Sequence, residues 1–415
     1  MNLRMLTDQI LKDVLVPVSM LAHPDRFGGH KHQDCLHGDL VVRDGKALGL
    51  QNHDGHGDAR QLVMPKLTEC HVHLDKCHSI SRMHGVGGDL QAAIEAQALD
   101  RAIWTTDDVR DRATRGLQEL IGSGCRSVRS HVDWTHGADA TVPPLAWHVL
   151  NELEQDHRNR VTLQICPLTG IDDLADSDVA NSIARLVAAT TGVLGAFVFQ
   201  QPNRQEGIKN AFRVAEKFGL ALDFHVDEGL ADGLNGLELV ADAALEHGFQ
   251  GPVLCGHACS LANLQGPDLT RVTDKIARAG LTIAALPATN LYLQGRASGT
   301  PDRRGITRMR ELGAAGVPVV VGTDNVRDAF CPIGRHDPCQ SLALAVLTAH
   351  LDPPFGDYLP MITTGADRAL GLAPAYVDVA AIGDLLLFDA TSTSDILSGT
   401  TRPVPLSDVC KGETV

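Results

Sequence analysis

Eight short apolar segments alternate with amphipathic stretches from about Gln61 onward, and this alternation restricts the fold more than any other feature. Apolar runs of strand length separated by helical patterns are typical of a parallel sheet covered by helices on both faces. Eight repeats favour a closed barrel over an open sheet. The expected strands are Leu62–Leu74, Ser127–Trp134, Val161–Pro167, Val193–Phe199, Ala221–Val226, Val253–His257, Thr282–Pro287 and Val317–Thr323.

Helical patterns fill the intervals between these runs. In the first of them, the residues from Thr106 offer an N-cap and Gly122 offers a stop. The expected helices are Thr106–Ile121, Leu145–Gln155, Val179–Thr190, Glu206–Phe218, Gly236–His247 and Arg304–Leu312, followed by closing helices at Gln340–His350 and Tyr358–Leu370.

The two ends of the chain read differently from the middle. Residues 1–60 are irregular, with weak strand signals at Asp13–Met20 and Gly38–Leu50, and the tail is again strand-like at Gly383–Asp389. We therefore predict an α/β fold: a (β/α)8 TIM-type barrel over residues 61–375, and a small β-subdomain formed by the N- and C-terminal segments, 1–60 and 376–415.

Composition excludes some partners. The 415 residues are 44% hydrophobic and carry a net charge of −15, which argues against nucleic acid or an anionic membrane as partner. No segment approaches the ~18 apolar residues of a membrane span, and the first twenty residues lack a signal-peptide pattern. Ten cysteines without a CxxC pair suggest a reducing, cytoplasmic setting. Assembly into a homo-oligomer stays open.

Metal-ligand residues stand at the ends of four of the expected strands. His71 and His73 end the first strand, and because side chains alternate along a strand, both imidazoles point to one side. In a barrel, that side is the interior at the mouth where active sites lie. Taken alone, such a pair often occurs by chance and is more often two ordinary polar residues at a strand end.

The fifth strand ends in a second group of such residues. His225 supplies a third imidazole, and Glu228 follows just past the strand end, where it can move protons beside a metal-bound water. Asp227 competes with Glu228 for this role. An acidic residue after a strand can also simply cap the next helix.

The sixth and eighth strands complete the set. His257 ends the sixth strand and is either a ligand or a group that polarises the attacking water, and Asp324 ends the eighth strand as a potential ligand and proton acceptor. In register with the first and fifth strands, these residues predict one divalent cation, zinc or iron, at the barrel mouth. The sequence therefore predicts hydrolytic chemistry.

Longer motifs around these residues resemble the amidohydrolase superfamily, in its cytosine deaminase-like branch, and N-isopropylammelide aminohydrolase. The resemblance covers nearly all of residues 61–375. The matching stretches are Glu69–Lys76, Ser130–Asp133, Phe224–Glu228, Asn290–Arg296, Arg304–Arg308 and Gly322–Asp328.

The resemblance implies a role for each of these residues. His71, His73, His225 and Asp324 would hold one zinc or iron ion. Glu228 would protonate a ring nitrogen of the substrate and then the leaving amine. His257 would orient the hydroxide, and Asp324 would take its proton. Relatives with two metals bridge them with a lysine on the fourth strand, and Val193–Phe199 contains none, which agrees with a single ion.

One position departs from the pattern. Relatives place a glutamine after the third strand to hold the amide edge of the substrate, and Leu168 stands there in this chain. A leucine cannot form that hydrogen-bonded pair, which argues against cytosine as the substrate. Asn325 and Phe330 replace an aspartate and a tryptophan of cytosine deaminase. Phe330 either stacks on a flat ring or packs its own loop.

Three further residues complete the expected substrate contacts. Trp134 is expected to form a wall of the pocket. His131 either lines the pocket or is a core histidine with its hydrogen bonds satisfied, and Gln294 contacts either the substrate or the barrel rim.

The function predicted from these residues is hydrolytic deamination of a nitrogen heterocycle of the cytosine, triazine or pterin type. Opening of a cyclic amide ring uses the same groups and is the first alternative. A barrel that kept its ligands but serves as a non-catalytic, metal-binding scaffold is the second.

Overall fold

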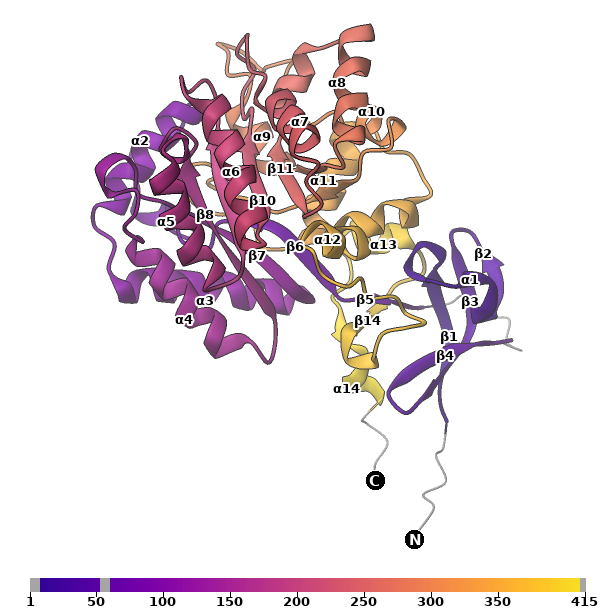
Figure 1. The fold of residues 1–415 in the computed structure, drawn as a ribbon. Helices are drawn as coiled ribbons and strands as arrows, with labels where there is room; N and C mark the ends of the chain where they lie inside the picture. Colours follow the sequence, from indigo (N-terminus) through magenta and orange to yellow (C-terminus); the bar gives the residue numbers. More distant parts are fainter. Residues whose placement is uncertain (1–7, 53–59, 411–415) are drawn as a thin grey trace.

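A computed structural model describes residues 8–52 and 60–410, and the predicted (β/α)8 barrel with a small β-subdomain is confirmed. Eight parallel strands form one sheet whose order follows the chain (Figure 1). They are β6 (Leu67–Val72), β7 (Cys125–Asp133), β8 (Thr162–Gly170), β9 (Val193–Val198), β10 (Ala221–Val226), β11 (Val253–His257), β12 (Thr282–Ala285) and β13 (Val319–Val321).

The barrel closes between its first and last strands. Val72 at the end of β6 forms a parallel bridge with Asp324, just past β13. The backbone N–H of Asp324 donates to the carbonyl of His71 at 2.8 Å. The closure therefore places two strand ends that carry predicted ligands directly beside each other.

Helices cover the outside of the barrel. Among them, α3 begins at Thr106 as expected, but its cap is the preceding residue, Thr105, whose side chain accepts a hydrogen bond from the backbone of Asp108. The predicted helices appear as α3 (Thr106–Gly122), α4 (Leu145–His157), α5 (Ser177–Ala188), α6 (Arg204–Phe218), α7 (Gly236–His247), α10 (Met309–Ala314) and α11 (Pro338–Ala349).

Two helical predictions need correction, and three helices of the barrel region were missed. The predicted helix Arg304–Leu312 begins only at Met309. The predicted helix Tyr358–Leu370 is a 3-10 segment, η6 (Phe355–Ile362), followed by α12 (Thr364–Ala369), and it breaks at Thr363, whose φ is −136° and ψ −109°. The missed helices are α2 (Leu90–Arg101), α8 (Gly266–Arg278) and α9 (Pro287–Leu293).

A separate sheet of strands from both ends of the chain lies beside the barrel (Figure 1). Its order is β15-β14-β5-β1-β3-β2, with β4 paired to β3. Its strands are β1 (Gln9–Pro17), β2 (His30–His32), β3 (Cys35–Arg43), β4 (Lys46–Gln51), β5 (Gln61–Pro65), β14 (Leu385–Asp389) and β15 (Val404–Pro405).

The predicted first strand, Leu62–Leu74, is in fact two strands in two sheets. β5 pairs antiparallel with β14, with Leu62 opposite Phe388, whereas β6 pairs with β7 in the barrel. Between them, Lys66 donates its N–H to Asp384 and Leu67 donates to Gly124, so the chain changes sheets at this point. The division of the chain at residues 60 and 375 stays a prediction. β5 falls within the predicted barrel range but belongs to the small sheet.

Among the described residues, no helix combines the length and the apolar character needed to cross a bilayer.

Candidate metal centre and pocket

Alternating residues of β6 and β7 supply the inner wall of the barrel. Glu69 and His71 on β6 and His73 just past its end are two residues apart, and Arg129, His131 and Asp133 follow the same spacing on β7. A period of two places each set on one face of its strand. In a parallel barrel, the last residue of each set reaches the carboxyl-terminal mouth.

The charged side chains deepest in the barrel pair with one another. Arg129 donates from Nη1 to Asp223 Oδ2 at 2.9 Å and from Nη2 to Gln164 Oε1 at 2.7 Å. Burial opposes ionisation of Asp223, but His131 and Arg129 outweigh it and lower the pKa of this carboxyl. His131 Nε2 lies 3.1 Å from Asp223 Oδ1, so the imidazole is anchored from below.

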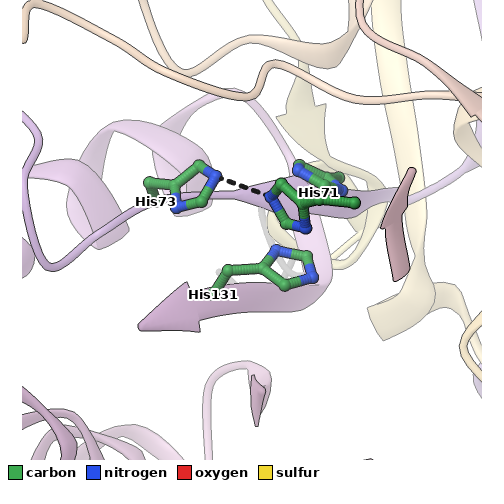
Figure 2. A group of neighbouring side chains, drawn as sticks. His71, His73 and His131 are labelled. Carbon is green, nitrogen blue, oxygen red and sulfur yellow. Dashed lines mark hydrogen bonds between the residues drawn. The ribbon is translucent and has the colours of Figure 1, made fainter. Parts of the chain in front are cut away.

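Three imidazoles and one carboxylate meet above these charged side chains. His73 Nε2 lies 3.1 Å from His225 Nε2. Asp324 Oδ1 lies 3.5 Å from His71 Nε2 and 3.3 Å from His73 Nε2. Figure 2 shows the rings of His71, His73 and His131 close together at the ends of their strands. The four predicted ligands therefore converge, and His131 lies beside them.

This cluster fits a metal ion. Within the described structure, buried His71 Nδ1 and Nε2, His225 Nδ1 and both oxygens of Asp324 have no hydrogen-bond partner. Ligands held at about 2.0–2.2 Å from one tetrahedral ion lie roughly 3.3 Å apart, which is the spacing seen here. Neutral imidazole is the form that binds metal, and burial lowers the pKa of His73 to about 3.

Close packing fixes the ring of His71. A side-chain carbon added to Gly256 on β11 would lie 3.0 Å from His71 Cε1, so the ring lies directly against the backbone of β11. On the other side, Glu69 accepts hydrogen bonds from the backbone N–H groups of His71, at 2.9 Å, and Thr323, at 3.1 Å. The sequence analysis assigned no role to Glu69, which connects the two strand ends that close the barrel.

Sharp turns follow the strands that carry the remaining groups. Asp227, His257 and Asp324 have φ of 52°, 68° and 59°, in the left-handed region that non-glycine residues seldom adopt. Such backbone positions are often concentrated at functional sites. Here they lie at the ends of β10, β11 and β13, the strands that lead to Glu228, His257 and Asp324.

The turn separates the two acidic residues after β10. Asp227 accepts hydrogen bonds from the N–H groups of Gly236 and Leu237, at 2.9 and 3.0 Å, and thus holds the start of α7. Glu228 instead lies in the pocket, with Oε2 3.6 Å from His257 Nε2. Burial, and to a smaller extent Asp324, raise the pKa of Glu228 to about 7.

Two neighbours orient His257. Its Nδ1 donates to Asn290 Oδ1 at 3.0 Å, and its backbone carbonyl accepts from Thr307 Oγ1 at 2.7 Å. With the proton on Nδ1, Nε2 of the neutral ring is an acceptor, and it faces Glu228.

The pocket above this cluster has a volume of about 440 Å³. Its floor contains His73, His225, Glu228 and His257. Flat or apolar side chains form much of the wall: Trp134, Leu168, Phe197 and Phe330. A volume in the range of roughly 300–1,000 Å³ is typical of small-molecule sites.

The predicted substrate contacts divide into two groups. Trp134, Leu168, Asn325 and Phe330 line the pocket, and Lys76 lies 5.0 Å above the ring of Phe330. His131 and Gln294 are absent from the lining. The Gln294 amide donates to the carbonyl of Glu228 at 3.1 Å, so its geometry favours positioning of Glu228.

Several lining residues were not anticipated. Lys76 forms a buried ion pair with Asp133, and Arg101 lies 3.6 Å from the same carboxylate. Arg101 and Gln97 come from α2, a helix that the sequence analysis did not predict. The motif at Glu69–Lys76 contained Lys76, but nothing in its spacing indicated which acid would pair with it.

Comparison with known proteins agrees with this geometry. Residues 84–391 match the model of the amidohydrolase family. The chain is also 32% identical over 382 residues to a pterin deaminase of Rhizobium rhizogenes strain K84, covering 90% of this chain and 86% of the relative. The chain belongs to the amidohydrolase family. The resemblance predicted from the motifs is therefore confirmed.

Two further proteins are also similar to this amidohydrolase. It is 20% identical to N-isopropylammelide isopropyl amidohydrolase of Pseudomonas sp. strain ADP, over 80% of each chain. Its fold matches 5-methylcytosine deaminase from Klebsiella pneumoniae, solved with phosphonocytosine, with a TM-score of 0.77 and 22% identity over 95% of each chain.

Proposed function

We propose that this protein is a metal-dependent hydrolase that removes an amino group from a bicyclic nitrogen heterocycle of the pterin type. The observation that carries the proposal is the convergence of His71, His73, His225 and Asp324 beside a flat-walled pocket that Glu228 and His257 line. In the overall reaction, water adds its oxygen to the ring carbon, the carbon–nitrogen bond breaks, and the products are a ring carbonyl and ammonia.

His71, His73, His225 and Asp324 would hold one zinc or iron ion. Such a cation, when bound, lowers the pKa of water so that it attacks at neutral pH. The fourth strand, Val193–Val198, contains no lysine to bridge a second ion. A single ion is therefore part of the proposal.

Glu228 moves the protons. With a pKa of about 7, this carboxyl holds a proton in part of the population at neutral pH and releases it easily. It hands a proton from Oε2 to the ring nitrogen next to the reacting carbon, and later to the departing amine. His257 Nε2 accepts a hydrogen bond from the attacking water and orients it. Asp324 accepts the proton that the water releases and returns it to Glu228 for the second transfer, so that both protons of the water end on the products.

The apolar wall orients the ring. Trp134 is held rigidly, because its indole N–H donates to the carbonyl of Ala140 at 2.8 Å and its ring packs edge-on against Trp147. With Phe197 and Leu168, it forms an apolar surface that fits the face of an aromatic ring and excludes water from the reacting carbon. The identity of 32% to a pterin deaminase supports a bicyclic ring over a pyrimidine.

A substrate panel tests this proposal. The purified, metal-loaded protein is incubated with pterin, guanine, cytosine and an aminated triazine, and with a hydantoin as a cyclic amide. Ammonia release and the change in ultraviolet absorption are followed. We expect ammonia from pterin at the highest kcat/KM. Ring opening of the hydantoin without ammonia would instead favour a cyclic amidohydrolase, and metal-loaded protein without any activity would favour a scaffold.

Replacement of Glu228 tests the proton transfer. Glu228→Gln keeps the size and hydrogen-bonding reach of the side chain but cannot carry the proton. We expect it to retain metal and to lose roughly 10²–10⁴-fold in kcat. Wild-type kcat in this variant, at full metal content, would contradict the role.

We also propose a reducing, cytoplasmic setting, because the ten cysteines are free thiols in the structure. Self-association and the absence of a nucleic-acid partner stay predictions.

A further inference from the structure

Helix α2 turns one face toward the pocket. Leu90, Ile94, Gln97 and Arg101 line it and follow each other at intervals of four, three and four residues. Residues at this spacing lie on one side of an α-helix. Asp89 caps the helix by accepting a hydrogen bond from the N–H of Ala92 at 3.1 Å. One side of the pocket is therefore formed by α2 and not by a strand of the barrel.

Gln97 is the unusual member of this face. It is only 2% exposed, and neither Oε1 nor Nε2 of its amide has a hydrogen-bond partner within the described residues. Most buried side-chain amides are paired, because removing such a group from water without a partner is costly. An unpaired amide in the lining of a ligand pocket is ready to pair with a ligand.

The neighbouring polar groups are already engaged. Gln201, which also lines the pocket, donates to the carbonyl of Phe197 at 3.2 Å and accepts from the N–H of Phe199 at 2.6 Å. Asn325 donates to Asp328 at 2.8 Å. Lys76 pairs with Asp133. Gln97 therefore offers both an uncommitted donor and an uncommitted acceptor.

The chemistry of an amide defines what it recognises. Its oxygen accepts and its NH2 donates in one plane, which matches the adjacent N–H and C=O of a lactam. Leu168, at the end of β8, has no polar atom for this task. We propose that the Gln97 amide, on α2, forms a pair of hydrogen bonds with the lactam edge of the substrate and so contributes to specificity. This contact rests on the proposed deamination of a pterin-type ring.

Binding measurements test the contact separately from turnover. In the Glu228→Gln background, quenching of ligand fluorescence gives the Kd for pterin and for 2-aminopteridine, which lacks the N3 proton and the 4-oxo group. Gln97→Met keeps the length of the side chain and removes both polar atoms. We expect it to raise the Kd for pterin roughly 10- to 100-fold and to change that for 2-aminopteridine far less.

A matched control comes from the same helix. Gln91 is exposed and donates to Glu95 at 2.9 Å, so Gln91→Met should leave both Kd values unchanged. The melting temperature of the Gln97→Met protein should hold or rise, because an unpaired buried amide is removed. A structural role for Gln97 would lower it.

The outcomes separate this contact from the proposed function. An unchanged Kd for pterin, an equal loss for both ligands, or no binding of pterin at all would overturn the role of Gln97. If Gln97→Met weakens pterin selectively while the wild-type protein releases no ammonia from pterin, the contact stands and the deamination proposal fails. If the wild-type protein deaminates pterin and Gln97→Met binds it normally, only the contact fails.

Discussion

Asn290 holds the imidazole that we propose as the orienting group for water. Its Oδ1 accepts from His257 Nδ1 at 3.0 Å, and it is fully buried. Asn290→Leu removes the acceptor, so the ring can rotate or carry its proton on Nε2 instead. We expect kcat to fall roughly 10- to 100-fold with a small change in KM, measured as ammonia release.

The control for this variant is Asn151→Leu on α4, where the amide bonds only to its own helix, through the carbonyl of Trp147. That variant should keep wild-type kcat. Equal kcat in Asn290→Leu and wild type, at equal metal content, would show that the hydrogen bond does not position His257.

Single residues also show where sequence reasoning succeeds and where it stops. The spacing of His71 and His73 was sufficient to place both on one face, because that depends only on the period of a strand. Asp227 and Glu228 could not be separated in this way. Their roles follow from the left-handed turn at Asp227, where φ is 52°. No local sequence pattern predicts this turn. Gln97 lay beyond reach, because its helix was not predicted.

Elements show a similar division. The run Leu62–Leu74 is apolar throughout, so no composition change marks the exchange of sheets at Lys66. The exchange of sheets depends on strands far away in the chain. Leu385–Asp389 pairs with β5, and Cys125–Asp133 pairs with β6. For α2, the inward face carries Gln97 and Arg101, so the helix lacks the apolar stripe that identifies an amphipathic helix. The polar residues that α2 turns toward the pocket therefore explain why its sequence pattern did not predict a helix.

Glu119 on α3 connects two loops that leave the barrel mouth. Its Oε2 lies 2.9 Å from His336 Nδ1 and 3.4 Å from His78 Nε2, and Arg327 lies 3.9 Å from Oε1. Burial works against ionisation, but these neighbours outweigh it and lower the pKa of Glu119 to about 2. The carboxylate therefore stabilises the fold fully above its ordinary pKa near 4.5, and this contribution is lost as pH falls toward 2.

Glu119→Gln should accordingly be less stable than wild type at pH 6, by about 2 kcal/mol, and the difference should shrink toward pH 3. Urea unfolding at several pH values measures it. Glu152→Gln on α4, whose carboxylate is 58% exposed, provides the surface control and should show a much smaller difference. A stability difference between Glu119→Gln and wild type that is independent of pH would contradict the assigned cause.

At the scale of the whole molecule, the barrel brings distant segments to one point. The proposed ligands come from β6, from β10 and from the turn after β13, and the barrel closes where Asp324 meets His71. Eight apolar runs were sufficient to predict this convergence, because parallel strands of a closed barrel end at one mouth. The route of the small sheet, with β14 returning beside β5, required the structure.

Removal of the metal should therefore affect folding as well as activity. Without a cation, several nitrogens of His71, His73 and His225 and both oxygens of Asp324 stay buried without hydrogen-bond partners within the described chain. A ligand that binds only the folded state stabilises it by about 4 kcal/mol at a concentration 1,000 times its Kd. We expect chelation to abolish ammonia release and to lower the melting temperature by roughly 5–10 °C, and added zinc or iron to restore both.

Asp324→Ala serves as the comparison, because it lacks the carboxylate ligand and should lose little further stability when chelator is added. If chelator changes neither the melting temperature nor the activity of the wild-type protein, an ion at the barrel mouth neither stabilises the fold nor takes part in the reaction. If chelation abolishes activity but leaves melting unchanged, the cation serves the reaction without stabilising the barrel. Equal stabilisation of wild type and Asp324→Ala by added metal would instead place the ion elsewhere in the molecule.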